Sequence, residues 1–133
     1  MADREVGPAT ARTVALSFQP AAEHVRTARL VAVAVARRTG LDEIRLDEIR
    51  LATGEVCARA VRRCAVTRVS EMVLVEIDDA GPVFEISVTD HSAGPDGERE
   101  AIALALVRGL ADTVTVADGP GGQGGVVRMG WSR

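Results

Sequence analysis

Two carboxylates in this chain stand at positions where they could do chemistry. Glu55 lies inside a segment with helical periodicity, and Asp90 closes the apolar run 83–90, which has the character of a strand. A carboxylate on a helix face can orient a hydroxyl or a water for attack, and one at a strand end can accept a hydrogen bond from a purine. Each also has a structural explanation, with Glu55 as an ordinary helix carboxylate and Asp90 as the start of a turn.

Three arginines follow Glu55 on the same predicted helix. Arg59 lies one turn after Glu55 in the favourable acid-before-base orientation, so an ion pair between them is expected. With Arg62 and Arg63 it forms a basic patch. A solvated face is the first expectation for such a patch, and docking of an acidic partner or a phosphate is the alternative.

The composition predicts one globular domain over residues 1–133, with 1–12 as a flexible N-terminus. The chain is 47% hydrophobic but only 2% aromatic, so its core must consist of Val, Leu, Ile and Ala. The formal net charge of −3 gives no general attraction to phosphate backbones. Nucleic acid is therefore not expected as a direct partner.

Neither a disulfide, a metal site nor a membrane segment is expected. Cys57 and Cys64 lie seven residues apart on one predicted helix, a rise of about 10 Å that a disulfide cannot bridge, so both are expected to be buried thiols. His24 and His91 have no companions at metal-ligand spacing. No apolar run reaches the roughly 20 residues of a membrane-spanning helix, and the first residues lack a signal pattern, which predicts a cytoplasmic location.

Hydrophobic periodicity predicts the elements of the fold. The expected order is strand 13–18, helices 22–38 and 46–64, strands 72–77 and 83–90, helix 100–111, and strands 113–116 and 126–129. This order favours an α/β (α+β) two-layer sandwich, with helices on one face of a mostly antiparallel mixed sheet.

Two short segments between these elements receive no functional role. The sequence Leu-Asp-Glu-Ile-Arg occurs twice in succession, at 41–45 and 46–50. Repeat architectures use longer periods, so this repeat predicts no solenoid, and the first copy is taken as a connector. The Gly-rich run 119–125 precedes a strand and not a helix N-terminus, so it predicts a turn and not a phosphate cradle.

The order of elements and four motifs resemble the bacterial anti-sigma factor serine kinases, which belong to the ATPase superfamily of gyrase and the histidine kinases. The motifs are Arg50–Glu55, Val88–Asp90, Ala105–Val116 and Gly119–Met129. The resemblance implies a histidine-kinase-like ATPase domain with Glu55 as general base and Asp90 as the acceptor for the adenine amino group. It also implies magnesium ATP as cofactor, a sigma factor or an anti-sigma antagonist as partner, and a homodimer.

The sequence departs from the family pattern at every phosphate-facing motif. Arg59 replaces the expected magnesium-binding Asn, and the first glycine box keeps only Gly94, with Ser92 expected to crowd a ligand. The second box aligns with 101–103, where alanine methyl groups oppose the required conformation. The Gly-Thr that the family carries near its last strand is Gly-Gly in this chain, at 124–125.

These departures predict a regulator that binds a protein partner, with nucleotide binding weak or lost and no cofactor. The alternative is an active ATP-dependent serine/threonine kinase in which Glu55 is the base, Asp90 and Gly94 contact the nucleotide, and Arg59 contacts a phosphate in place of the metal. A nucleotide sensor that binds without turnover is a third possibility.

Overall fold

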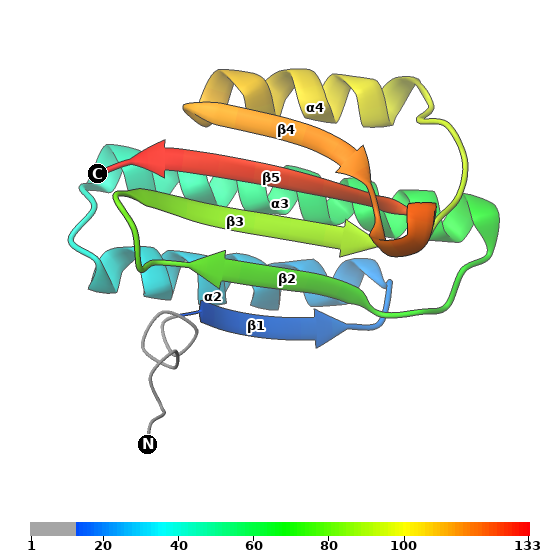
Figure 1. Ribbon diagram of the computed structural model, residues 1–133, viewed down its shortest axis with the longest axis horizontal. Coiled ribbons are helices and arrows are strands. Elements are labelled where there is room, and N and C mark those ends of the chain that lie inside the picture. The colour runs from blue at the N-terminus through cyan, green and yellow to red at the C-terminus, as the bar shows by residue number, and fades with distance from the viewer. Residues whose placement is uncertain (1–12) are drawn as a thin grey trace.

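A five-stranded antiparallel sheet forms one layer of the structure. The computed structural model describes residues 13–133, so the predicted flexible segment 1–12 lies outside it. The strands are β1 (Thr13–Phe18), β2 (Val73–Asp78), β3 (Val83–Asp90), β4 (Thr113–Asp118) and β5 (Gly125–Ser132). They lie in the order β1-β2-β3-β5-β4 (Figure 1). All neighbouring pairs are antiparallel, so the described sheet has no parallel component.

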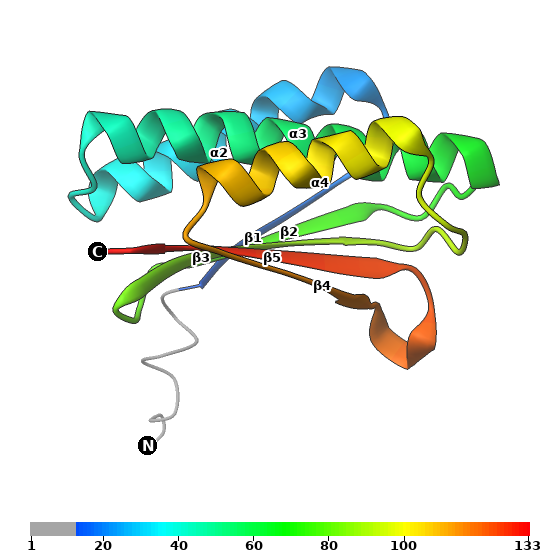
Figure 2. The same cartoon turned by 90° about the horizontal axis from the view of Figure 1, so that it is seen from above.

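Helices form the second layer, on one face of the sheet (Figure 2). They are α2 (Val25–Arg38), α3 (Glu43–Thr67) and α4 (Glu98–Leu110), with short 3-10 turns η1 (Ala22–His24) and η2 (Pro120–Gly122). The predicted two-layer α/β sandwich and the predicted element order are confirmed. No helix of the described chain is long and apolar enough to cross a membrane.

The central helix α3 starts earlier than predicted. The side chain of Asp42 accepts a hydrogen bond of 2.9 Å from the amide of Arg45 and so caps the helix. Residues 43–45 are therefore helical, and the prediction that 41–45 is only a connector is wrong. At the other end, Arg68 takes a left-handed conformation with φ 57° and closes the helix.

The core between the layers is mainly aliphatic, as predicted. The apolar face of α3 includes Ile49, Val56 and the two thiols Cys57 and Cys64, all fully buried and the thiols free. Burial raises the pKa of Cys57 to about 12, which leaves it an unreactive apolar side chain. The indole of Trp131 is buried and donates a hydrogen bond of 3.0 Å to the carbonyl of Leu110, which ties β5 to the end of α4.

Candidate functional site

A cleft of about 390 Å³ opens at the end of β3, where the resemblance places the nucleotide. It lies between α3, the segment 91–97 that follows β3, the end of β4 and the Gly-rich turn 119–125. Its lining includes Arg59, Arg63, Gly94, Asp96 and Asp118. Charged side chains from α3, the 91–97 segment and β4 therefore reach its walls, between small residues.

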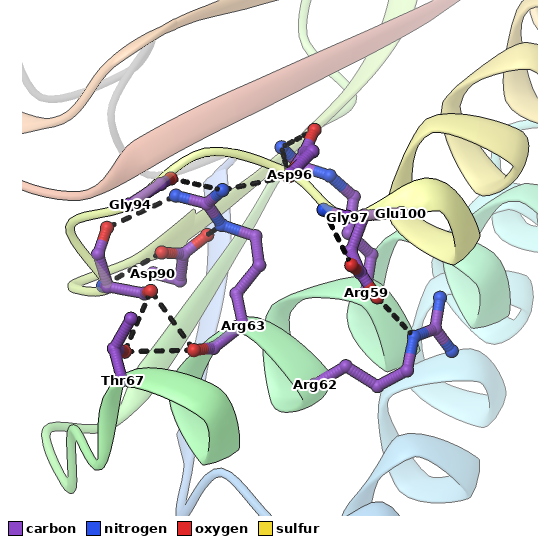
Figure 3. A network of polar contacts seen from close by, with 10 residues as sticks. Arg59, Arg62, Arg63, Thr67, Asp90, Gly94, Asp96, Gly97 and Glu100 are labelled. Carbon is purple, nitrogen blue, oxygen red and sulfur yellow. Dashed lines mark hydrogen bonds and ion pairs between the residues drawn. The ribbon is translucent and has the colours of Figure 1, made fainter.

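Asp90 is buried and paired with an arginine of the protein itself. The Nε of Arg63 donates to Oδ2 of Asp90 at 3.3 Å, and only 2% of the Asp90 side chain is exposed. The other guanidinium nitrogens of Arg63 donate to the carbonyls of Ser92 at 3.1 Å and Gly94 at 3.0 Å, and to Asp96 at 2.8 Å (Figure 3). All three nitrogens of this guanidinium thus have acceptors.

The segment after Asp90 folds back on α3. The amide of Ser92 donates to Oδ1 of Asp90 at 2.9 Å, and its hydroxyl donates to the carbonyl of Arg63 at 3.0 Å. The hydroxyls of Ser92 and Thr67 lie 2.9 Å apart. Ser92 is therefore buried against the helix and does not line the cleft, so the prediction that it crowds a ligand there is wrong.

Arg59 pairs with Asp96 and not with Glu55. Its Nη2 contacts both carboxylate oxygens of Asp96, at 3.0 and 2.9 Å, and only 4% of the arginine side chain is exposed. Within residues 13–133 no ion pair joins Arg59 to Glu55, so that predicted pair is wrong. The Nε of Arg59 is buried without a hydrogen-bond partner in this part of the chain.

Asp96 thus bridges two arginines from successive turns of α3. Burial alone would raise its pKa, but hydrogen bonds from Arg59 and Arg63 outweigh that effect and hold the pKa below the ordinary value of 3.8. The carboxylate is therefore ionised at neutral pH and fixes the segment 91–97 to α3. No pattern in the sequence indicated Asp96, because it lies 33 and 37 residues from its two partners.

The expected solvated basic face does not exist. Arg59 and Arg63 are buried, and the partly exposed Arg62 donates from Nε to Glu100 at 2.9 Å. This hydrogen bond lowers the pKa of Glu100. All three arginines are therefore neutralised by carboxylates of the 91–97 segment or of α4.

The N-terminus of α4 is also occupied by the protein's own groups. Glu100 accepts a hydrogen bond of 2.9 Å from the amide of Gly97, and Glu98 adds a second carboxylate to the first turn. Residues 101–103, which align with the second glycine box, are helical, and Ala103 is buried. This helix end therefore presents carboxylates where a phosphate would need donors.

Glu55 lies apart from the other predicted site residues. It is half-buried and lines a separate cavity of about 490 Å³ between α2 and α3, together with Arg26 and Arg29. Arg59 and Gly94 line the cleft. Asp90 does not line it but accepts a hydrogen bond from Arg63, which does. The structure thus brings Arg59, Gly94 and Asp90 together around one cleft and leaves Glu55 outside it.

Close packing explains the glycine at 124. Gly124 has φ +67°, and a Cβ on it would lie 2.0 Å from the carbonyl oxygen of Asp90. Gly125 pairs with Asp90 on one side and with Asp118 on the other. The segment forms the predicted turn between the last two strands.

Magnesium ATP does not fit this arrangement of residues. The acceptor expected to recognise adenine already binds Arg63, and the position expected to supply a metal-binding amide carries an arginine paired to Asp96. No chemical step through ATP follows from this geometry.

Comparison with known proteins places the chain in a family. Residues 18–131 match the family described as the histidine kinase-like ATPase domain. The crystal structure of the RsbU and RsbW domains of a Mycobacterium tuberculosis protein is similar, with a TM-score of 0.72 and 21% identity. The match covers 90% of this chain and 31% of that one, so this chain spans about a third of that protein's length. No curated protein matches. By the match over nearly all of its length, this chain belongs to the histidine kinase-like ATPase domain family.

Proposed function

We propose that the protein is a regulator of the anti-sigma factor type that works by binding another protein, with nucleotide binding weak or lost. The observation that carries this proposal is the buried pair of Arg63 and Asp90, which places a cation of the chain on the carboxylate expected to recognise adenine. The partner proposed is a sigma factor or an anti-sigma antagonist. The resemblance to anti-sigma factor serine kinases supports this choice, and the similar solved structure contains an RsbW domain.

The energy of the Arg63–Asp90 pair is large enough to matter for nucleotide affinity. Asp90 is buried and does not line the cleft, so adenine can reach it only if the groups that cover it, Arg63 among them, move, and breaking a buried ion pair costs about 3–5 kcal/mol. Each 1.4 kcal/mol is about a tenfold change in affinity, so this cost weakens binding by roughly a hundredfold or more. A micromolar site would become one of roughly 0.1 mM to millimolar affinity.

The charges that line the cleft add to this cost. Asp96 and Asp118 line it, and the positive charges of Arg59 and Arg63 are already balanced by Asp96 and Asp90. A triphosphate would therefore meet the unpaired carboxylate of Asp118 and no unpaired cation among the lining residues. Like charges in a partly closed site are strongly unfavourable.

Calorimetric titration with magnesium ATP tests the nucleotide half of the proposal. We expect no micromolar binding to the wild type, and none to Arg59→Asn, because restoring one amide leaves Arg63 on Asp90. Arg99→Asn is the matched control, since Arg99 is exposed on α4. Micromolar binding to the wild type that disappears in Asp90→Asn would overturn the proposal.

Affinity capture from the native cell extract, followed by identification of the captured protein, tests the partner half. We expect a sigma factor or an anti-sigma antagonist, and a cytoplasmic location and a homodimer belong to the same proposal. Capture of neither class of protein would contradict it.

One observation favours the alternative of an active serine/threonine kinase. A cavity of about 390 Å³ remains beside Arg59 and Gly94, although Glu55 lines a different one. Transfer of labelled phosphate from ATP to a purified antagonist, abolished by Glu55→Gln, would establish the kinase. Phosphate transfer should be absent if the regulator assignment is correct.

A further inference from the structure

Strand β4 forms an edge of the sheet that no described element covers. In the order β1-β2-β3-β5-β4 it has a neighbour only in β5, and in Figure 2 it lies below α4 at the rim of the sheet. Five of its six residues are exposed, and Val114 alone is half-buried. Its outer backbone groups are therefore open to solvent.

This edge lacks the features that usually block strand addition. Natural edge strands carry lysine, proline or a bulge that prevents another chain from pairing with them. The sequence of β4, Thr-Val-Thr-Val-Ala-Asp, has no lysine, arginine or proline. Its register with β5 runs without interruption from Thr113 to Asp118. Four β-branched residues in a row also favour extended backbone.

The register identifies which backbone groups are free. The amide of Gly119 donates to the carbonyl of Gly124 at 3.3 Å, which extends the β4–β5 ladder by one hydrogen-bonded pair. Hydrogen-bonded pairs alternate along an antiparallel ladder, so Thr113, Thr115 and Ala117 bond to β5. The N–H and C=O groups of Val114 and Val116 therefore point outward.

Charge decides what kind of strand fits this edge. Asp118 lines the cleft at the end of β4 and has no ion pair among the described residues, whereas Arg59 and Arg63 are both paired. A basic side chain from an added strand would neutralise Asp118. An acidic one would meet both Asp118 and Asp96.

The same charges disfavour a second copy of this chain. Antiparallel self-pairing over the whole strand, centred on Thr115, places Asp118 opposite Asp112 of the other copy, and does so twice by symmetry. Asp112 lies just before β4 and already binds Arg45, so self-pairing gives Asp118 no basic partner. Other registers that keep the outward groups paired shorten the overlap or set Asp118 against Val114.

We propose that β4 binds an extended segment of a protein partner by strand addition, and that this segment carries β-branched residues and a lysine or arginine placed against Asp118. Hydrogen bonds to Val114 and Val116 supply the affinity, and the basic residue sets the register. The inference rests on the proposed function, since it names a surface for the protein partner.

Binding of a capped synthetic peptide, Lys-Val-Thr-Val-Thr, to the full chain tests the surface by NMR, because antiparallel pairing sets its lysine against Asp118 and its last residue against Val114. We expect saturable binding and at least tenfold slower hydrogen exchange at the amides of Val114 and Val116. Val116→Pro should abolish binding, because it removes an outward N–H and leaves the ladder to β5 intact. Asp118→Asn should weaken binding about fivefold, and Val116→Thr, which keeps the N–H, should bind as the wild type does.

One further variant keeps the test decisive. Val116→Lys should block the peptide even if the proline variant folds poorly, since an edge lysine repels a basic strand. Equal peptide binding by the wild type and Val116→Lys would overturn the inference. Sedimentation that shows a wild-type dimer and a Val116→Lys monomer would also overturn it, because the occupant would then be a second copy.

The outcome for the whole partner separates this inference from the proposed function. If the wild type and Val116→Lys bind a sigma factor or antagonist equally, the edge inference fails and the proposed function stands. If neither a sigma factor nor an antagonist binds, while the peptide still slows hydrogen exchange at the amides of Val114 and Val116, the choice of partner is wrong and the strand-addition surface stands.

Discussion

Arg63 on α3 forms an ion pair with Asp90 at the end of β3. Only 9% of the Arg63 side chain and 2% of the Asp90 side chain are exposed. The pair joins the helix layer to the sheet at the mouth of the cleft. Because the remaining nitrogens of Arg63 bind Ser92, Gly94 and Asp96, one side chain also fixes the course of the 91–97 segment.

Removing Arg63 should cost more stability than removing both partners. Arg63→Ala leaves Asp90 as an uncompensated buried charge, so we expect the free energy of unfolding to fall by about 3–5 kcal/mol. Urea denaturation of Arg63→Ala, Asp90→Ala and the double variant measures the coupling. Arg99→Ala, on the exposed side of α4, is the control and should change stability by less than about 0.5 kcal/mol. Strict additivity of the two single changes would contradict an energetically coupled pair.

Asp112 should contribute to stability more than an ordinary surface carboxylate. It binds Arg45 through two hydrogen bonds, of 3.0 and 2.7 Å, and accepts a third from the amide of Ser132, so it joins the start of α3 to the end of β5. We expect Asp112→Ala to lower the free energy of unfolding by about 1–2 kcal/mol. Asp47, which pairs with Arg50 three residues away on the exposed surface, is the control. Its alanine variant should cost at most about 0.5 kcal/mol, and equal losses would refute a clamp at Asp112.

The protein should lose stability in acid through the carboxylates that bind arginines. The pKa values of Asp96 and Asp112 lie below the ordinary 3.8, for Asp96 because the arginines outweigh its burial, and for Asp112 because Ser132 and Arg45 donate to it. The unfolded chain therefore binds protons first, and the stabilisation is complete above the unfolded pKa and disappears as pH falls through the folded one. Unfolding free energies measured between about pH 5 and pH 2 should decrease, and less steeply for Asp96→Asn. The same slope in Asp96→Asn and the wild type would show that this carboxylate carries none of the effect.

Two glycines of one turn should respond differently to alanine. At Gly124 a Cβ would lie 2.0 Å from the backbone oxygen of Asp90, whereas at Gly121 nothing lies within 4 Å. Both have positive φ, of 67° and 69°, so each substitution carries the left-handed penalty of about 1–2 kcal/mol. In thermal unfolding, the melting temperature of Gly124→Ala should lie well below that of Gly121→Ala, because only the substitution at Gly124 must also displace the end of β3. Matching melting temperatures would mean that the turn relaxes without cost.

The secondary structure could be predicted from local patterns alone. Alternating apolar residues specify the strands, and the helical spacing of residues such as Ile49, Val56 and Cys64 specifies α3, because these periods determine which side chains share a buried face. The order of elements then favoured two layers with an antiparallel sheet, which the structure has. The sequence does not predict that α3 begins at Glu43. That start depends on one hydrogen bond from the amide of Arg45 to the side chain of Asp42, and the identical sequence at 46–50 offers a second candidate start.

The site was decided by tertiary structure. Spacing on one helix suggested that Arg59 pairs with Glu55 and that Arg63 is solvated, but both arginines find Asp96, 37 and 33 residues away. Which carboxylate an arginine meets depends on the course of a loop and on the direction of each side chain, and neither has a period that a sequence can display. The sequence therefore determined the layers, and only the folded chain determined that Arg63 pairs with Asp90, because long-range ion pairs form only after distant elements have packed.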